Sequence, residues 1–577
     1  MRATARVQPD AVAITDGAGV LTYAGLLAET DRLAAAMRRA GAGQGDIVAL
    51  CAARSIEQVT AMLAVLDLGA VVAPFDARQA PMAARESVRR LRPALVLADR
   101  EGKSVFPGAA ALNDPTAVQA VPAETGSRAS GLAYVLHTSG STGRPKAVMV
   151  PHTALANRCA WGQTVYPVGP GDTIVHSGSP AFDISVWSAL APLSFGATVL
   201  VVPAEADGDP GALAKLMDEH GATAVHFVPS MLKEFLAETG GAGLAGLKYL
   251  FVGGERLSPE LARAAVAATP ARVFNQYGPT ESCIDIFTRE LRPGDLSGGP
   301  VPIGEGISGI RAHVVGPDGS PAADGEEGEL LVGGACLAWG YGGAPAATAS
   351  AFIPDALSGI PGARLYRTGD LVRRRADGVM DFVGRVDQQV KIRGVRVEPS
   401  DVDHVLAAHP AVADAAVVAV PAADGQLGLV AHIVPVSEVP DTELRAFVAD
   451  RLISAAVPGA FVTHTALPRL TSGKIDRREL ERRLPEIPVD SIAAPEPPRT
   501  GTERRIAEIW GELLKADGLG RTADFLRLGG QSLLAMRMIA RVRDRFGVRL
   551  PVRTVFAAPT VAEFAAVLDE AIGEEQE

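Results

Sequence analysis

Hydrophobic residues between Leu21 and about Val383 form short continuous runs that alternate with longer segments of helical period. The short runs include DIVALCA, LVLADR, TIVHSG, ATVLVVP, AVHFVP and KYLFVGG, and the helical segments include IEQVTAMLAVLDLG and PGALAKLMDEHG. Continuous apolar runs of this length predict buried strands, and their alternation with helices is typical of parallel sheets. The pattern therefore predicts a large α/β domain with mostly parallel sheets.

The pattern changes at GRVDQQVKIRG, which begins at Gly384 and carries more charge. Strand and helix patterns continue from there to LPRLTSGKIDR, which predicts a small α+β subdomain. The following stretch LPEIPVDSIAAPEPPRTG is rich in proline and has no period, as expected for a semi-rigid linker. We expect a large subdomain over 1–386, a small subdomain over 387–483, a linker over 484–500 and a last domain over 501–577.

The last domain is expected to be helical throughout. Its amphipathic patterns are TERRIAEIWGELLKA, SLLAMRMIARVRDRFG, a short VRTVFAA and TVAEFAAVLDEAI, which predict a four-helix bundle. In the second pattern Leu534, Met538 and Val542 share one face. Thr560 and Glu563 have the spacing of a capping box at the start of the last helix.

Composition narrows the class of protein. The chain has 577 residues, 47% of them hydrophobic, and a formal net charge of -11, which predicts several globular domains and disfavours nucleic acid as a partner. The four cysteines, Cys51, Cys159, Cys283 and Cys336, are far apart, which argues against a disulfide framework and fits a reducing cytoplasm. No apolar run reaches the ~20 residues of a membrane span, so we expect no contact with a membrane.

Two short stretches carry candidate chemistry. In LGGQSLL, Ser532 follows two glycines and begins a predicted helix, so its hydroxyl could be a helix cap, a hydrolase nucleophile or an attachment point. In TSGSTGRPK, which begins at Thr138, backbone N–H groups, hydroxyls and Lys146 suit a polyphosphate, although the Walker A spacing is absent. Composition alone also allows a plain turn here.

The order of residues in TSGSTGRPK resembles the phosphate loop of the adenylate-forming superfamily. Further motifs of that family occur along the chain in the order expected for the family. They are LTYAGL, LGAVVAPFD, FDISVW, NQYGPTE, GELLVGG, YRTGDL, GRVDQQVKIRG and LTSGKIDR. The chain up to the linker is similar to an adenylation domain of nonribosomal peptide synthetases, and the last domain is similar to a peptidyl carrier protein. The resemblance thus covers nearly the whole chain as an adenylation-carrier didomain.

The resemblance implies a nucleotide site. Its residues are Thr138, Ser139, Gly140, Ser141, Thr142, Gly143, Lys146, Gly254, Asn275, Tyr277, Thr280, Asp370 and Arg385. Tyr277 and the glycine turn at Gly254 would enclose the adenine, with Asn275 at its edge, and Asp370 would accept from both ribose hydroxyls.

The resemblance also implies the catalytic groups. They are Thr138, Lys146, Glu281 and Lys474. Glu281 would hold Mg²⁺, and Lys474 would bridge the reacting carboxylate and the α-phosphate of ATP. Asp387 matches the hinge about which the small subdomain rotates between the two half-reactions.

The acid substrate is implied by FDISVW. In the family the aspartate of this motif, here Asp183, pairs with the α-ammonium of an amino acid, so an acyl or aryl acid would leave it uncompensated. The implied substrate-binding residues are Asp183, Ile184, Trp187, Phe227, Phe251, Gly253, Gln276, Ile284 and Asp285. A one-residue shift around Phe227 and Phe251 stays open. The polar end of this set favours glutamine, then glutamate, with serine or a basic residue as alternatives.

The same resemblance makes Ser532 the attachment site of 4'-phosphopantetheine. The expected reaction uses ATP and Mg²⁺ to form aminoacyl-AMP and pyrophosphate, and then loads the amino acid as a thioester on the carrier. No HHxxxDG condensation motif and no GxSxG motif occurs, so we expect a free-standing didomain. Its expected partners are a phosphopantetheinyl transferase, a downstream condensation or tailoring enzyme and an MbtH-like activator. The alternatives are an acyl- or aryl-acid ligase that loads a carrier or CoA, and a non-catalytic carrier scaffold.

Overall fold

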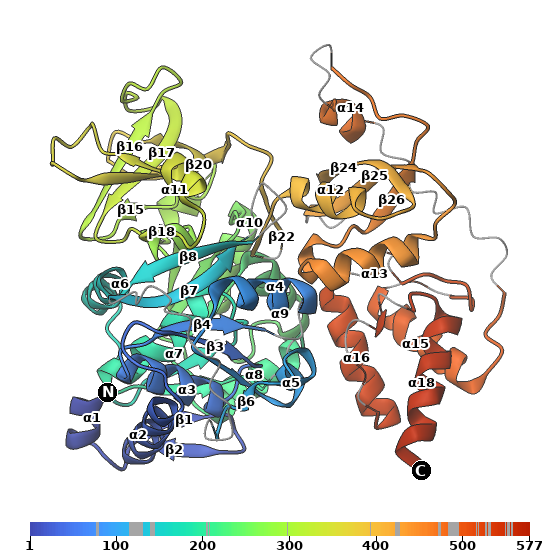
Figure 1. Ribbon diagram of the computed structural model, residues 1–577, viewed down its shortest axis with the longest axis horizontal. Coiled ribbons are helices and arrows are strands. Elements are labelled where there is room, and N and C mark those ends of the chain that lie inside the picture. The colour runs from blue at the N-terminus through green and yellow to red at the C-terminus, as the bar shows by residue number, and fades with distance from the viewer. Residues whose placement is uncertain are drawn as a thin grey trace. The chain divides into compact units, whose positions relative to one another are not determined.

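The computed structural model describes residues 1–76, 80–114, 131–138, 145–203, 206, 208–296, 298–392, 394–421, 427–470, 475–482, 496–514, 516, 518–525, 528, 532–548, 550, 554–555 and 558–576. The chain divides into two compact units (Figure 1). The first comprises Met1–Thr138, Pro145–Ala204 and Pro210–Gln388, and the second is built mainly from Gln389–Glu577. The division between Gln388 and Gln389 lies two residues from the predicted 386/387 boundary.

The largest sheet of the first unit has nine strands. In spatial order they are β15 (Glu305–Gly306), β14 (Phe287–Glu290), β13 (Arg272–Tyr277), β12 (Tyr249–Gly253), β11 (Ala224–Phe227), β9 (Thr173–His176), β10 (Thr198–Val201), β1 (Val12–Thr15) and β2 (Val20–Thr22). The neighbours from β13 to β1 are parallel, and β14, β15 and β2 add antiparallel edges. The apolar runs TIVHSG, ATVLVVP, AVHFVP and KYLFVGG form strands here, as predicted.

A second sheet of seven strands lies in the same unit. Its order is β18 (Gly340–Tyr341), β8 (Lys146–Pro151), β7 (Leu132–Thr138), β4 (Val71–Phe75), β3 (Ile47–Cys51), β5 (Leu95–Ala98) and β6 (Ala110–Ala111). The strands from β7 to β6 are parallel, whereas β7 and β8 form an antiparallel hairpin. That hairpin ends at the predicted phosphate loop.

The third sheet of this unit is antiparallel throughout, so the large α/β subdomain combines parallel and antiparallel sheets. It contains β16 (Ile310–Val315), β17 (Glu327–Gly334), β20 (Arg364–Arg374), β19 (Phe352–Pro354) and β21 (Met380–Arg385). A parallel pair needs a crossover of a dozen or more residues, usually a helix. Consecutive strands that pair here, such as β20 and β21, are joined by links shorter than this, so they return antiparallel, and α11 (Pro345–Ala351) lies between β17 and β19, which do not pair with each other.

Helices connect the strands of the first two sheets. They are α1 (Arg2–Val7), α2 (Tyr23–Arg39), α3 (Ile56–Asp67), α4 (Pro81–Leu91), α5 (Arg100–Val105), α6 (His152–Val165), α7 (Asp183–Phe195), α8 (Pro210–Glu219), α9 (Pro229–Thr239) and α10 (Pro259–Ala268). Residues Ser185–Leu193 of α7 are all buried. A helix that is buried all round lies inside the protein.

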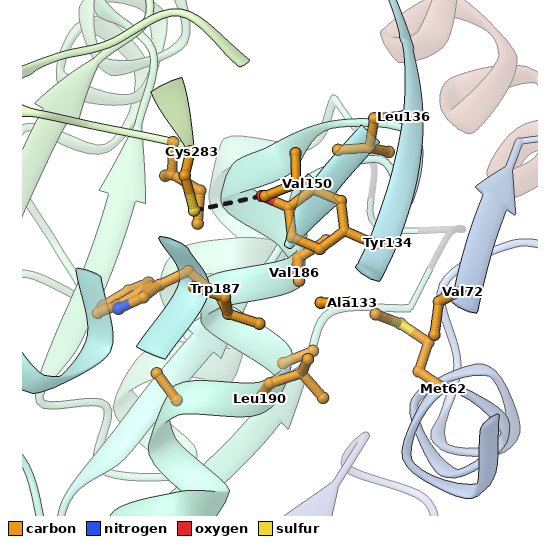
Figure 2. Close-up of a cluster of buried hydrophobic side chains, with 14 of the residues drawn as sticks. Met62, Val72, Ala133, Tyr134, Leu136, Val150, Val186, Trp187, Leu190 and Cys283 are labelled. Atoms are coloured by element: carbon orange, nitrogen blue, oxygen red, sulfur yellow. Dashed lines mark hydrogen bonds between the residues drawn. The ribbon is translucent and has the colours of Figure 1, made fainter. Parts of the chain in front are cut away.

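Figure 2 shows the core that surrounds α7. Met62 of α3 and Val72 of β4 lie on one side, and Val186 and Trp187 of α7 lie beside Tyr134 of β7. The Tyr134 hydroxyl lies 3.5 Å from the Cys283 sulfur. The four cysteines are free thiols, as the sequence predicts.

The second unit begins with the predicted small subdomain. A hairpin of β22 (Val390–Ile392) and β23 (Val395–Val397) precedes a three-stranded sheet of β24 (Val412–Pro421), β25 (Leu427–Pro435) and β26 (Ala460–Thr463). The helices are α12 (Pro399–Ala407), α13 (Asp441–Arg451) and α14 (Arg477–Arg482). This is the α+β composition that the sequence predicts.

Among the described residues of the last domain, three long helices pack around a core of their own. They are α15 (Gly501–Leu514), α16 (Ser532–Phe546) and α18 (Val561–Gln576). Met538 and Val542 are buried, and Leu534 packs against the same core beside Trp510 and Phe564, which confirms the predicted apolar face. The capping box is also confirmed, because the Glu563 N–H donates to the Thr560 hydroxyl and the Thr560 N–H donates to the Glu563 carboxylate. Of the expected short helix in VRTVFAA, the described residues Thr554 and Val555 are helical.

Candidate active site

The predicted phosphate loop connects the two strands of a hairpin. Thr138 ends β7 and is paired directly with Lys146, which begins β8. Among the described residues, the buried Thr138 hydroxyl has no hydrogen-bond partner. A buried hydroxyl normally has a hydrogen-bond partner. The other predicted loop residues, Ser139, Gly140, Ser141, Thr142 and Gly143, lie outside the described part of the chain.

Lys146 is connected to Glu281 through a tyrosine. The Lys146 ammonium lies 5.3 Å from the centroid of the Tyr341 ring, and the Tyr341 hydroxyl donates to Glu281 Oε1 at 2.8 Å. Glu281 belongs to the short helix Thr280–Ser282 and is completely buried. Tyr341 was not predicted, because it reaches the site through β18, which pairs with β8. The described residues contain no cluster of three or more metal-ligating side chains.

Asp370 is the centre of a second network. It lies opposite Arg385 in the β20–β21 pair, and Arg385 donates to its Oδ1 while the buried Tyr277 hydroxyl donates to its Oδ2. Burial, and then the Asp370 charge, raise the pKa of the Tyr277 hydroxyl well above its usual value. The phenol is therefore a fixed donor. The fold thus joins three residues predicted for the nucleotide site, of which Tyr277 and Asp370 lie 93 positions apart in sequence.

The same network reaches the predicted hinge. Arg385 also donates to both carboxylate oxygens of Asp387, at 2.6 and 2.8 Å. Close by, Asn275 is buried and donates to the Pro302 carbonyl at 2.7 Å. Gly254, predicted for the adenine turn, has φ +89°, a conformation that favours glycine.

Asp183 is the first residue of the buried helix α7. Its Oδ1 accepts from the Ile184 N–H at 2.8 Å, and its Oδ2 accepts from the Thr280 hydroxyl at 2.8 Å. Thr280 directly precedes Glu281, so the predicted ammonium-binding and magnesium-binding carboxylates are joined by one threonine. Trp187 follows one helical turn later and is buried.

The strand register corrects one predicted substrate residue. Phe251 of β12 is paired with His226 of β11 and with Phe274 of β13, so these three side chains share one face of the sheet. Phe227 lies on the opposite face, where its ring packs 5.0 Å from that of Phe235. Because side chains alternate along a strand, a one-residue shift in alignment exchanges the two faces. His226, and not Phe227, therefore lies beside Phe251.

Gly253 and Gln276 belong to this same face and are paired with each other. A Cβ atom at Gly253 would lie 2.8 Å from the Gln276 carbonyl oxygen and 3.3 Å from His226 Nε2. The glycine is thus needed for the close approach of its neighbours. Burial, and then the nearby charge of Arg158, lower the pKa of His226 to about 4, so the ring is neutral at pH 7.

Asp285, another predicted substrate-binding residue, contacts an arginine that was not predicted. Asp285 accepts from Arg158 Nε at 2.7 Å, and both side chains are buried. Arg158 and the neighbouring Tyr166 sit in or just after α6, far from the motifs in sequence. Ile284, next to Asp285, is buried as well.

The predicted catalytic lysine and the predicted attachment serine lie in the second unit. Lys474 lies outside the described residues, while the flanking Arg469 and Ile475 pair as an antiparallel bridge. Ser532 is the first residue of α16, as predicted.

Comparison with known families decides what this chain is. Residues 1–342 match the family described as AMP-binding enzyme, residues 401–474 match its C-terminal domain, and residues 504–568 match the phosphopantetheine attachment site family. The chain belongs to the AMP-binding enzyme family. It is an adenylation domain joined to a carrier domain, and enzymes of this family use ATP and Mg²⁺.

Its relatives are nonribosomal peptide synthetases. The chain is 38% identical to phosphinothricin tripeptide synthetase PhsB of Streptomyces viridochromogenes, over 98% of this chain and 48% of that protein. It is 35% identical to enterobactin synthase component F of Escherichia coli, over 97% of this chain and 44% of that protein. The chain thus spans about half of the length of these two relatives.

Solved structures of this family have the same fold. An NRPS protein containing adenylation and PCP domains matches with a TM-score of 0.77 and 26% identity, over 100% of this chain and 97% of that one. An artificially fused adenylation-PCP di-domain from Klebsiella oxytoca matches with a TM-score of 0.69 and 26% identity, over 80% of this chain and 92% of that one. Among the described residues, no helix is long and apolar enough to cross a membrane.

Proposed function

We propose that this adenylation-carrier chain activates an amino acid with ATP, releases pyrophosphate, and transfers the aminoacyl group from aminoacyl-AMP to its own carrier domain. The observation that carries the proposal is the presence of both family matches in one chain, with the serine of LGGQSLL at the start of α16. Such a chain makes the carrier a tethered substrate, at a high local concentration.

The nucleotide is assigned to the Tyr277–Asp370–Arg385 network. Asp370 uses one lone pair of each oxygen for Tyr277 and Arg385, and a carboxylate has further lone pairs for the two ribose hydroxyls. Tyr277 and Gly254 enclose the adenine, and Asn275 lies at its edge. Thr138, Lys146 and the loop residues 139–143 bind the phosphates.

Glu281 is assigned to Mg²⁺. It is a single buried carboxylate, and Mg²⁺ is commonly held by one or two carboxylates together with substrate phosphates and water. Tyr341 orients this carboxylate through its hydrogen bond. Lys474 provides the cation that neutralises the developing charge as the substrate carboxylate attacks the α-phosphate.

Asp183 selects an amino acid over a simple acyl or aryl acid. It lies at the start of a buried helix, with Thr280 and the Ile184 N–H as hydrogen-bond donors, and its carboxylate suits an ammonium group. An acid without an amine offers no positive charge to pair with this carboxylate. The acyl- or aryl-acid ligase is therefore the second candidate function, and a non-catalytic scaffold is the third.

Ser532 is assigned as the attachment site of 4'-phosphopantetheine. The start of a helix favours the anionic phosphodiester, because free backbone N–H groups and the helix dipole face it. When bound, the arm supplies a thiol on a long flexible tether. A phosphopantetheinyl transferase is then a required partner, a condensation or tailoring enzyme takes the product, and an MbtH-like protein is a candidate activator. Asp387 is assigned as the hinge between the two half-reactions.

The test measures the intact mass of the full-length chain after treatment with a phosphopantetheinyl transferase and CoA, and again after ATP, Mg²⁺ and the proteinogenic amino acids. Wild type is expected to gain a phosphopantetheine increment and then an aminoacyl increment. Ser532→Ala should gain neither, yet retain ATP–pyrophosphate exchange, whereas Lys474→Ala should gain only the first. ATP–pyrophosphate exchange with acyl or aryl acids but with no amino acid would favour the acyl- or aryl-acid ligase. Phosphopantetheine attachment without any such exchange, with an MbtH-like activator present, would favour the non-catalytic scaffold.

A further inference from the structure

A buried ion pair lies beside the predicted substrate residues. Arg158 in the middle of α6 donates from Nε to Asp285 Oδ1 at 2.7 Å, and the two side chains are 1% and 5% exposed. Their charges cancel, so the pair as a whole is neutral. Burying such a pair costs desolvation energy that offsets much of the mutual attraction, which makes a purely stabilising role a weak explanation.

Aromatic rings enclose the guanidinium. Its central carbon lies 5.4 Å from the Trp161 ring, 5.5 Å from the Tyr166 ring and 5.4 Å from the Trp187 ring. Tyr166 and Trp187 in turn contact Phe251, at 4.8 and 5.7 Å between ring centroids. Arg158 is thus part of the same cluster as the predicted substrate residues Trp187 and Phe251.

Trp187, whose ring contacts the Arg158 guanidinium, lies one helical turn from the proposed ammonium site. Trp187 is four residues after Asp183 on α7, which corresponds to a rise of about 6 Å. An amino acid held by Asp183 through its ammonium would therefore direct its side chain toward the cluster around Trp187. This distance is the length of a short to medium side chain.

Three polar atoms of the pair have no partner among the described residues. They are Nη1 and Nη2 of Arg158 and Oδ2 of Asp285, all buried. Leaving a buried donor or acceptor unsatisfied is energetically costly. The pair therefore offers donors and an acceptor side by side to a group that can use both.

The local backbone is arranged to hold the pair in place. Cys283 and Ile284, directly before Asp285, have φ angles of 64° and 75°, which L residues rarely adopt and which cluster at functional sites. On the other side, a Cβ at Gly162 would lie 2.9 Å from Arg158 Nη1 and 3.0 Å from the Tyr166 ring. A glycine is needed there for the guanidinium to reach Asp285.

We propose that the Arg158–Asp285 pair recognises the side chain of the amino acid and selects an uncharged side chain with both a donor and an acceptor, a carboxamide or a hydroxyl. This inference rests on the proposed amino-acid activation. Asp285 Oδ2 accepts from the side chain while Arg158 donates to it. A charged side chain is disfavoured because the pair is already neutral, and an aliphatic one leaves three buried polar atoms unsatisfied. Glutamine is favoured over glutamate on this ground.

The test is ATP–pyrophosphate exchange by the full-length chain with a panel of amino acids. The panel pairs glutamine with glutamate, methionine and lysine, and serine and threonine with alanine and valine. Wild type is expected to prefer a carboxamide or hydroxyl by at least about tenfold over the aliphatic and charged amino acids of similar size, the discrimination typical of one or two hydrogen bonds.

Single substitutions should then shift the preference in opposite directions. Asp285→Asn leaves the Arg158 charge without its partner and should raise kcat/KM for glutamate relative to glutamine. Arg158→Gln should raise kcat/KM for lysine relative to glutamine. The double variant Arg158→Met with Asp285→Leu contains no unpaired charge, so it keeps the test valid if the single variants do not fold. This double variant should prefer methionine or leucine. Arg289→Gln breaks a partly buried ion pair with Asp295 elsewhere in the same unit and should leave the ranking unchanged.

Two outcomes would overturn the inference alone: a wild-type preference for an aliphatic, aromatic or charged amino acid, or the wild-type ranking retained by all folded variants of the pair. Exchange with no amino acid, in a chain that accepts phosphopantetheine, would overturn the proposed function as well. The two failures are therefore distinguished by the wild-type measurement.

Discussion

Asp370 and Arg385 lie opposite each other in the β20–β21 pair, and the guanidinium that binds Asp370 also binds Asp387. One arginine thus connects a residue assigned to the ribose with the residue assigned as the hinge, next to the division between the two units. Because the same donor group serves both carboxylates, a change at the hinge alters the contacts of Asp370.

Gly369→Ala tests this connection. Gly369 has φ +72°, and a Cβ there would lie 2.7 Å from Arg385 Nη2 and 3.2 Å from Asp387 Oδ2. We expect a free energy of unfolding lower by about 1–3 kcal/mol together with a higher KM for ATP in pyrophosphate exchange. Gly378→Ala is the matched control, because Gly378 has φ +86° but a Cβ there meets nothing within 4 Å. It should lower stability and leave the KM for ATP unchanged; equal changes in KM would contradict the connection.

Asp183→Asn is expected to lower kcat/KM for the amino acid by about 30-fold or more, since losing one partner of a buried charge pair costs about 2–5 kcal/mol. The KM for ATP should change little. Thr280→Val removes only one hydrogen bond to Asp183 and should cost about tenfold or less. Ser194→Ala, near the other end of α7, is the control and should have no effect. An equal loss for ATP and amino acid would assign Asp183 to another role.

His137 is expected to make folding stability depend on pH. Burial lowers the pKa of its ring to about 4, from an ordinary value of 6.5, so the unfolded chain binds a proton between these values and the folded chain does not. Stability from this group is fully present above about pH 6.5 and is lost as the pH falls toward 4. Between pH 7 and pH 5 the loss is on the order of 1–2 kcal/mol.

The measurement is urea unfolding of wild type and His137→Phe at pH 7 and pH 5. The ring of His137 packs 5.0 Å from that of Phe75, so phenylalanine keeps the aromatic contact and removes the titration. The variant should lose less stability than wild type on acidification. Equal losses in the two proteins would show that His137 does not contribute.

Thr560→Ala should destabilise the carrier domain by about 1 kcal/mol, because it removes the hydroxyl that caps α18. Faster hydrogen exchange of α18 amides in the full-length chain would measure the effect. Glu563→Gln keeps an acceptor for the Thr560 N–H and should cost less. A change no larger in Thr560→Ala than in Glu563→Gln would contradict the capping role.

Much of the fold followed from local sequence patterns. Apolar runs such as DIVALCA and KYLFVGG became β3 and β12, IEQVTAMLAVLDLG became α3, and the Thr560–Glu563 spacing became a cap, since strand burial, helix period and capping are properties of neighbouring residues. The antiparallel sheet over 310–385 was not predicted, because the same apolar strands suit either direction and only the lengths of their connections decide between them.

The motifs likewise predicted which residues bind the nucleotide, whereas the tertiary structure decided how these residues contact one another. Which of His226 and Phe227 faces Phe251 depends on the strand register, which a one-residue shift reverses. Arg158 and Tyr341 lie outside the motifs, and nothing in their neighbouring residues marks them as part of a site. They meet Asp285 and Glu281 only because α6 and β18 pack beside the loop after β13, and contacts between segments so distant in sequence are set by packing of the whole unit.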